Sequence, residues 1–280
     1  MFDSHTHTTW SPDAHCPPEA LCERAVQAGL FAVTITDHMD VSSYISRDGF
    51  FAIRGSNRDA LALKEQYAGR LQVLSGVEIG EGFWHPDYTK RLLNAFSFDA
   101  VLGSIHTVRY GKVPIPYSRI DFGAQTENDI DAFLVQYFKD VLYMVLHDDI
   151  DIVTHLTCPL RYINGIYGRQ IEDMRYIDAI EEILKAVISR GLALELNTSG
   201  IGTPWHTFMP QKHILECYRA LGGELVTLGS DSHHPQKVGC GLLEGQALLQ
   251  ACGFSGYHYF SQRTPIFVTF ESTLNKGKEQ

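Results

Sequence analysis

The 280-residue chain lacks the long hydrophobic run that a membrane-spanning helix requires. Crossing a bilayer takes about 18 or more consecutive apolar residues, and no uncharged apolar window in this sequence approaches that length. Residues 1–5, Met-Phe-Asp-Ser-His, also lack the basic and apolar segments of a secretory signal peptide. We therefore expect a soluble, cytoplasmic protein that does not associate with a membrane.

The sequence has neither paired cysteines nor an excess of positive charge. Its six cysteines lie far apart, with no Cys-x-x-Cys motif, and we interpret them as reduced and mostly buried thiols. The chain contains 23 lysines and arginines against 33 aspartates and glutamates, a formal net charge of −10. Proteins that bind nucleic-acid polymers usually carry a basic excess, so extended binding to DNA or RNA is not expected.

Short apolar runs alternate with helical patterns along the whole chain, without a linker, a low-complexity tract or a solenoid repeat. Seven runs predict buried parallel strands: residues 1–6, 31–36, 71–77, 100–105, 150–154, 192–196 and 225–229. Helices are predicted between them: residues 18–28, 54–67, 87–94, 128–146, 175–189, 211–221 and 242–252. The tail at residues 266–270 is expected to add a strand or a cap.

This alternation favours a single α/β domain over residues 1–280, built as a (β/α) barrel, with an open doubly wound sheet as the alternative. In such barrels the chemistry lies at the carboxyl ends of the strands. Six histidines and three carboxylates occur just after these predicted strands: His5, His7, Asp13, His38, Glu78, His106, His155, Asp231 and His233. The turn that carries Asp13 is expected to fold back over the same end.

So many titratable side chains at one mouth indicate bound metal. A single histidine at a strand end is more often a structural residue, but burying many titratable groups unpaired is costly. His5 and His7 alternate along a strand, so both side chains face the same way and can bind one ion. Imidazole and carboxylate ligands without thiolates favour zinc, manganese or iron. Because nine ligands exceed the capacity of one ion, we expect two or three divalent transition-metal ions, bridged by a carboxylate such as Glu78.

Six motifs surround these residues, in order over residues 1 to about 240: His5-x-His7, Thr36-Asp37-His38, Gly76-Val-Glu78, Gly103-Ser-Ile-His106, Thr154-His155 and Gly229-Ser-Asp231-Ser-His233. Together they resemble the motifs of the polymerase and histidinol phosphatase (PHP) family. Within it, the stretches at residues 99–106, 195–200 and 222–233 are most similar to the monofunctional histidinol-phosphate phosphatases of bacterial histidine biosynthesis. Residues 155–162 depart from the family pattern, because the aspartate that usually stands two residues after the histidine is replaced.

The resemblance implies a distorted (β/α)7 TIM-like barrel with a trinuclear metal site. It assigns a first ion to His5, His7, Glu78 and Asp231, a second to Glu78, His106 and His155, and a third to Asp13, His38 and His233. It also implies a small-molecule phosphomonoester substrate, L-histidinol phosphate, which is hydrolysed to L-histidinol and phosphate. A hydroxide bridging two ions is the expected nucleophile, because metal ions lower the pKa of bound water to roughly 7.

Other side chains are candidates for contact with the substrate. Arg161 is the candidate clamp for the phosphoryl oxygens, because a guanidinium can bind two of them at once; the alternative is a surface arginine on a loop. Asp13 and His233 are the alternatives for protonating the leaving alkoxide. Three further residues are candidate substrate contacts near the mouth: Glu81, His85 and His206.

Two other functions share these motifs. One is a PHP-type nuclease or nucleotide phosphatase that acts on short oligonucleotides or nucleoside bisphosphates. The other is a binding module in which the metal only stabilises the fold, although the intact set of ligands argues against it. The sequence selects neither the metal nor the oligomeric state, so a homo-oligomer stays open.

Overall fold

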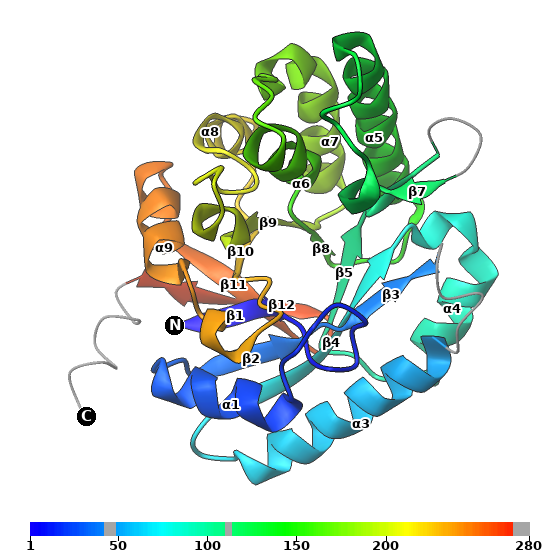
Figure 1. Cartoon of the computed structure of the whole chain (residues 1–280). Coiled ribbons are helices and arrows are strands. Elements are labelled where there is room, and N and C mark those ends of the chain that lie inside the picture. The colour runs from blue at the N-terminus through cyan, green and yellow to red at the C-terminus, as the bar shows by residue number, and fades with distance from the viewer. Residues whose placement is uncertain (42–48, 110–113, 271–280) are drawn as a thin grey trace.

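Seven parallel strands form the centre of the molecule in the computed structural model, which describes residues 1–41, 49–109 and 114–270 (Figure 1). Their order is β1-β2-β4-β5-β8-β9-β10, so consecutive units of the chain lie side by side. The bounds of these strands are β1 Phe2–Thr6, β2 Ala32–Ile35, β4 Gln72–Gly80, β5 Ala100–Ser104, β8 Ile152–Val153, β9 Ala193–Asn197 and β10 Val226–Gly229.

The sheet curls into a barrel whose two edges meet just after β10. There Thr6 and Ser232 form a parallel bridge, and the amide of Asp231 donates to the carbonyl of His5 at 2.8 Å. The buried carboxylate of Asp3 holds the seam, since it accepts the backbone N–H groups of Ser230 at 2.8 Å and Gly239 at 2.9 Å. This closure confirms the predicted barrel and excludes the open doubly wound sheet.

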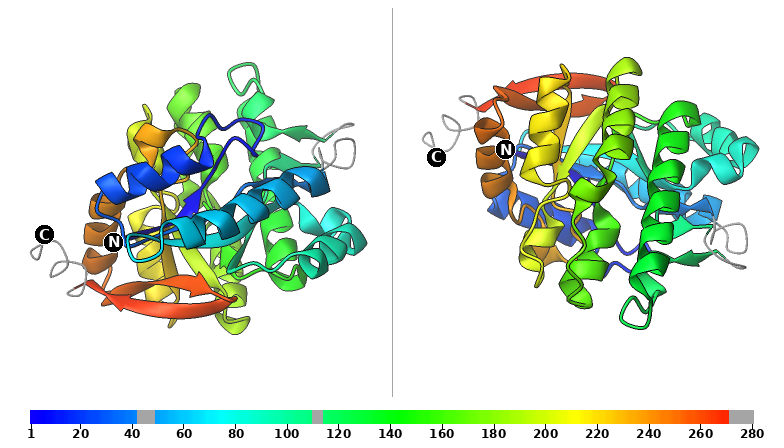
Figure 2. Two further views of the ribbon diagram at one scale, coloured as in Figure 1. Left: turned by 90° about the horizontal axis from the view of Figure 1, so that it is seen from below. Right: turned by 90° about the horizontal axis from the view of Figure 1, so that it is seen from above.

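Helices cover the outside of the barrel, as the two views of Figure 2 show. Their bounds are α1 Pro18–Gln27, α3 Gly49–Gln66, α4 Pro86–Ala95, α5 Glu127–His147, α6 Cys158–Leu160, α7 Ile177–Ser189, α8 Lys212–Ala220 and α9 Leu242–Ala251. Local signals explain several of their ends: Pro18 opens α1, and Thr126 forms a capping box with Asp129 at the start of α5. None of the described helices is long and apolar enough to span a bilayer.

Several short elements were not predicted. The strand β3 (His38–Asp40) pairs with β4, and β6 (Thr107–Val108) forms a hairpin with β7 (Ile115–Pro116). After α6 the chain continues as a π-helical turn over Arg161–Ile166, where a loop was expected. The tail is an antiparallel hairpin of β11 (Gly256–Ser261) and β12 (Thr264–Thr269), so the strand expected near residues 266–270 is present and starts earlier.

The β11–β12 hairpin, drawn in red in Figure 2, packs across the amino ends of the barrel strands. Phe260 packs against inward-facing apolar residues of the three strands β5, β8 and β9: Ala100, Leu102, Ile152 and Ala193. Arg263 lies in the turn of the hairpin and binds Asp151 at 2.7 Å and Asp149 at 2.8 Å. An apolar plug therefore fills the amino end of the barrel, which leaves the carboxyl end for polar side chains.

Candidate metal centre

Strand geometry brings the first histidines together. His5 and His7 stand two residues apart at the end of β1, both fully buried, and their Nε2 atoms lie 3.0 Å apart. The parallel pairing of β3 with β4 sets His38 directly opposite Glu78. As a result, Nδ1 of His38 lies 2.8 Å from Oε2 of Glu78.

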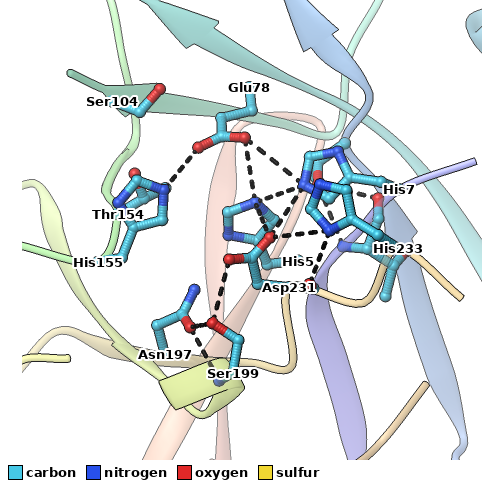
Figure 3. Close-up of polar contacts among 12 residues, drawn as sticks. His5, His7, Glu78, Ser104, Thr154, His155, Asn197, Ser199, Asp231 and His233 are labelled. Carbon is cyan, nitrogen blue, oxygen red and sulfur yellow. Dashed lines mark hydrogen bonds and ion pairs between the residues drawn. The ribbon is translucent and has the colours of Figure 1, made fainter. Parts of the chain in front are cut away.

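Glu78 is the centre of the site (Figure 3). Its Oε1 atom lies 2.9 Å from Nε2 of His155 and 3.3 Å from Nε2 of His106. Its Oε2 atom faces the other group, at 3.3 Å from Nε2 of His5 and 3.5 Å from Nε2 of His7. The single carboxylate thus lies between two sets of histidines, as a bridging ligand would.

The segment after β10 completes the centre. Asp231 has a positive φ of 52°, and its Oδ1 atom lies 3.3 Å from Nε2 of His7. His233 approaches His38, with 3.4 Å between the two Nε2 atoms. The carboxylate of Asp13, 61% exposed, lies 3.6 Å from each of these two histidines at the open edge. The structure therefore gathers all nine predicted ligands at one end of the barrel.

The electrostatics of the centre fit cations. Burial by itself would raise the pKa of Glu78, but the charges of His5, His106 and His38 outweigh it and lower that pKa well below its usual range. Burial lowers the pKa of His7 well below its usual range, and His38 and His233 lower it further. Burial alone would also lower the pKa values of His5, His106 and His38, but nearby carboxylates outweigh it, raising the first two well above the usual range and that of His38 to about 9. The centre therefore surrounds ionised carboxylates with positive charge, which metal ions would supply in place of these protons.

The arrangement of the donor atoms fits metal as well. Three pairs of ring nitrogens point at each other: His5 with His7, His38 with His233, and His106 with His155 at 3.4 Å. Three groups have ligand atoms within 4.8 Å of one another: His7, His38 and His233; His5, His7 and Asp231; and His38, Glu78 and His106. Two neutral imidazoles that meet nitrogen to nitrogen share at most one proton, whereas a cation between them accepts both lone pairs.

A cavity of about 890 Å³ opens onto the centre, and Arg161 lines it. The guanidinium, 21% exposed, donates to Oγ of Ser199 at 2.8 Å and to the hydroxyl of Tyr162 at 3.1 Å, and lies 3.9 Å from Oδ2 of Asp231. Arg161 is therefore held beside the candidate metal ligands rather than on a surface loop. His85 also lines this cavity, in agreement with its predicted position.

Two predicted substrate contacts lie elsewhere. The carboxylate of Glu81 is buried and accepts the backbone N–H groups of His106 at 2.5 Å and Thr107 at 2.6 Å, so it supports the chain behind the site. His206 is exposed outside the cavity, and its ring contacts the carbonyl of Ile201. Both residues follow predicted strands at the expected end, but their local backbones direct the side chains away from the cavity.

Two carboxylates at the centre were missed. Asp40, at the end of β3, contacts Nδ1 of His106 at 2.8 Å, and Glu195, inside β9, contacts Nδ1 of His5 at 2.7 Å. A signal for Glu195 was available, because an acidic residue within an otherwise apolar strand is costly to bury without a partner. Asp40 gave less warning, since the strand that carries it was not expected.

Known proteins resemble this chain over nearly its whole length. A probable histidinol-phosphatase of Clostridium acetobutylicum is 28% identical over 279 residues, 99% of each chain. The histidinol-phosphatase of Lactococcus lactis is 24% identical over 262 residues, 93% of this chain and 94% of that protein. The crystal structure of the histidinol phosphate phosphatase of Lactococcus lactis, complexed with zinc, L-histidinol and phosphate, superimposes with a TM-score of 0.79. That match has 22% sequence identity and covers 95% of this chain and 98% of the other.

The PHP domain family itself matches residues 3–199. This range includes seven of the nine predicted ligands, and its length exceeds half of the chain. The chain therefore belongs to the PHP domain family.

Proposed function

We propose that this protein is a histidinol-phosphatase, which hydrolyses L-histidinol phosphate to L-histidinol and phosphate. The observation that carries the proposal is that a relative of this name aligns with 99% of the chain, while the cavity keeps the predicted His and carboxylate donors beside Arg161. A module in which metal only stabilised the fold would not need an open cavity that ends on the ligands.

The nine gathered side chains are proposed to hold two or three divalent ions of zinc, manganese or iron. His5, His7 and Asp231 would share one ion, His106 and His155 a second, and Asp13, His38 and His233 a third, with Glu78 as the bridge. When bound, such ions stabilise the negative charge of the phosphoryl group and make water a stronger nucleophile at neutral pH. Metal analysis of protein purified without chelator tests the number, and fewer than one ion per chain in active enzyme would exclude the cluster.

The remaining steps fall to side chains. Arg161 is oriented by Ser199 and Tyr162, and its planar guanidinium binds two phosphoryl oxygens at once. In a form that holds only two ions, the proton for the leaving alkoxide is proposed to come from the pair of Asp13 and His233, with Nε2 of His233 as the donor and Oδ2 of Asp13 3.6 Å from it at the open edge.

One observation favours a second substrate class. The cavity is also lined by Arg109 and Arg119, and the positive charge of Arg109 acts on Asp140, where it opposes the rise in pKa that burial causes. The guanidinium carbon of Arg109 lies 4.2 Å from the ring centre of Trp84. These cations would attract a second anionic group, as in a nucleoside bisphosphate or a short oligonucleotide, and would not assist binding of the amine of histidinol.

A side-by-side rate comparison decides between the two. Phosphate release is measured from histidinol phosphate, a nucleoside 3′,5′-bisphosphate and a short oligonucleotide, each with zinc, manganese and iron. The proposal expects the highest kcat/KM for histidinol phosphate. A higher kcat/KM for the bisphosphate that falls in an Arg119→Ala variant would instead support the second class.

A further inference from the structure

Glu195 occupies an unusual place between two proposed ligands of different ions. It lies within β9, fully buried, with its side chain directed into the barrel. Its Oε1 atom lies 2.7 Å from Nδ1 of His5. Its Oε2 atom accepts the backbone N–H of His155 at 2.8 Å and the side-chain amide of Asn197 at 3.1 Å.

We propose that Glu195 is a positioning residue that sets the metal-binding nitrogen of His5 and the backbone conformation of His155. The proposal rests on the metal centre proposed above and assigns Glu195 no contact with substrate. The carboxylate accepts a hydrogen bond from the N–H at Nδ1 of His5, which leaves the lone pair of Nε2 directed at Glu78 and Asp231. A histidine ligand whose other nitrogen donates to a carboxylate has a fixed tautomer and ring orientation.

The second oxygen of the Glu195 carboxylate, Oε2, stabilises an unfavourable backbone conformation at His155. His155 has a φ of 22°, a conformation that residues other than glycine rarely adopt. Its N–H donates directly to Oε2 of Glu195, and its ring then reaches Glu78. One side chain thereby couples His5 of the first proposed ion to His155 of the second.

The neighbouring strand is shaped to admit this carboxylate. A Cβ atom on Gly229, in β10, would lie 2.5 Å from Oε1 of Glu195 and 2.5 Å from Cβ of His5. Any other residue at position 229 would therefore separate the two partners. This close approach gives a physical reason for the glycine in the Gly229-Ser-Asp231 motif.

A glutamine at position 195 would reverse the tautomer of His5 without changing the size of the side chain. Oδ1 of Asn197 accepts the N–H of Ser199 at 3.0 Å, which fixes the Asn197 amide as a donor toward position 195. With two donors on that side, the glutamine oxygen must face His155 and Asn197, and its NH2 group must face His5. Nδ1 of His5 would then accept, and the proton would move to Nε2, the atom that faces the metal centre.

The test compares zinc binding by wild type, Glu195→Gln and the control Asp99→Asn, measured against a chromophoric chelator on protein first stripped of metal. Asp99 is a matched control, because it is a buried carboxylate that accepts a backbone N–H, from Ser75 at 3.0 Å, at the opposite end of the barrel. We expect Glu195→Gln to lose about 10- to 100-fold in affinity for at least one ion and Asp99→Asn to retain wild-type affinity. The visible spectrum of the cobalt-loaded variant should also differ from that of wild type.

Equal zinc affinity in wild type and Glu195→Gln would overturn this inference alone, whereas a wild type that binds no zinc would overturn the proposed metal centre. If Glu195→Gln does not fold, the zinc-loaded wild type decides by 15N NMR, with the His5 signals assigned by their loss in His5→Gln. Coordination through Nε2 with a protonated Nδ1 is expected. Coordination of His5 through Nδ1 would refute the role of Glu195.

Discussion

Replacing Glu78 with glutamine tests the centre most directly, because this one carboxylate faces five histidines. The contact distances run from 2.8 Å to His38 up to 3.5 Å to His7. Removing a unit charge about 4 Å from a cation costs about 4 kcal/mol at an effective dielectric constant of 20. If that loss falls on the transition state, kcat/KM decreases about 1000-fold, and a charge shared by two divalent ions makes this a lower bound.

Glu78→Gln should have little effect on the stability of the fold. Glutamine fills the volume of glutamate, so the free energy of unfolding of the metal-free protein is expected to change by less than about 2 kcal/mol. Stability must be compared without metal, because bound ions stabilise the folded state. The assay is phosphate release from histidinol phosphate, together with elemental analysis of each preparation.

The matched control is Glu181→Gln, which makes the same chemical change on the outer face of α7, where Glu181 pairs with Lys185 at 2.9 Å. Its activity and metal content should equal those of wild type. A Glu78→Gln enzyme with full metal content and a kcat/KM within tenfold of wild type would refute the bridging role.

Four further results are expected. Arg161→Lys keeps the charge but loses the planar pair of donors, so kcat/KM should fall about 10- to 100-fold with metal content unchanged. A kcat/KM within a factor of two of wild type for both Arg161→Lys and Arg161→Ala would show that this residue does not bind the phosphoryl group. Chelation should lower the unfolding midpoint by about 5–10 °C, because ions at 100 times their Kd contribute about 2.7 kcal/mol, and an unchanged midpoint in calorimetry would contradict the metal centre. Burial raises the pKa of Asp148 to about 7 in the folded state, so the free energy of unfolding of wild type should fall as the pH rises from about 4 to 7 and this carboxyl ionises. Chemical denaturation should show Asp148→Asn becoming more stable than wild type by up to about 4 kcal/mol across this range. A difference between the two proteins that does not change with pH would contradict this. Arg263→Ala should lower the free energy of unfolding by about 2 kcal/mol, because it leaves buried Asp151 without its cation, and a matching loss of activity would show that the two ends of the barrel are coupled.

The barrel was predictable because buried parallel strands appear in the sequence as short, nearly continuous apolar runs. The interior of β4 is apolar apart from Ser75 and Glu78, so the local sequence is enough to predict a buried strand there. The order of the strands followed from their order along the chain. Helix ends were less certain: α3 begins at Gly49 rather than near residue 54, because helix boundaries leave a weaker signal in the sequence than helix interiors.

The parts that escaped prediction depend on contacts between distant residues. The three-residue strand β3 exists because His38 and Asp40 find partners along β4, and no periodicity can be detected over so few positions. Glu81 stands one residue past β4, at the expected end for a substrate contact. Its φ of 52° turns it toward the backbone of His106 and Thr107, which local sequence did not reveal.

Glu195 and Asp40, the two carboxylates behind the histidines, can be seen in the sequence, but their partners cannot be identified from it. Glu195 and Asp40 each approach a histidine Nδ1, and each does so beside a glycine of a neighbouring strand, Gly229 and Gly80, whose missing side chain leaves room for the carboxylate. Glycine weakens a strand interior, so its presence there signals a close approach by some other group. The approaching group is known only once the strands are placed side by side. An acidic residue inside an apolar strand should therefore be considered together with a glycine inside the adjacent strand. In a barrel with histidines at its strand ends, this combination indicates the carboxylates that orient the candidate ligands.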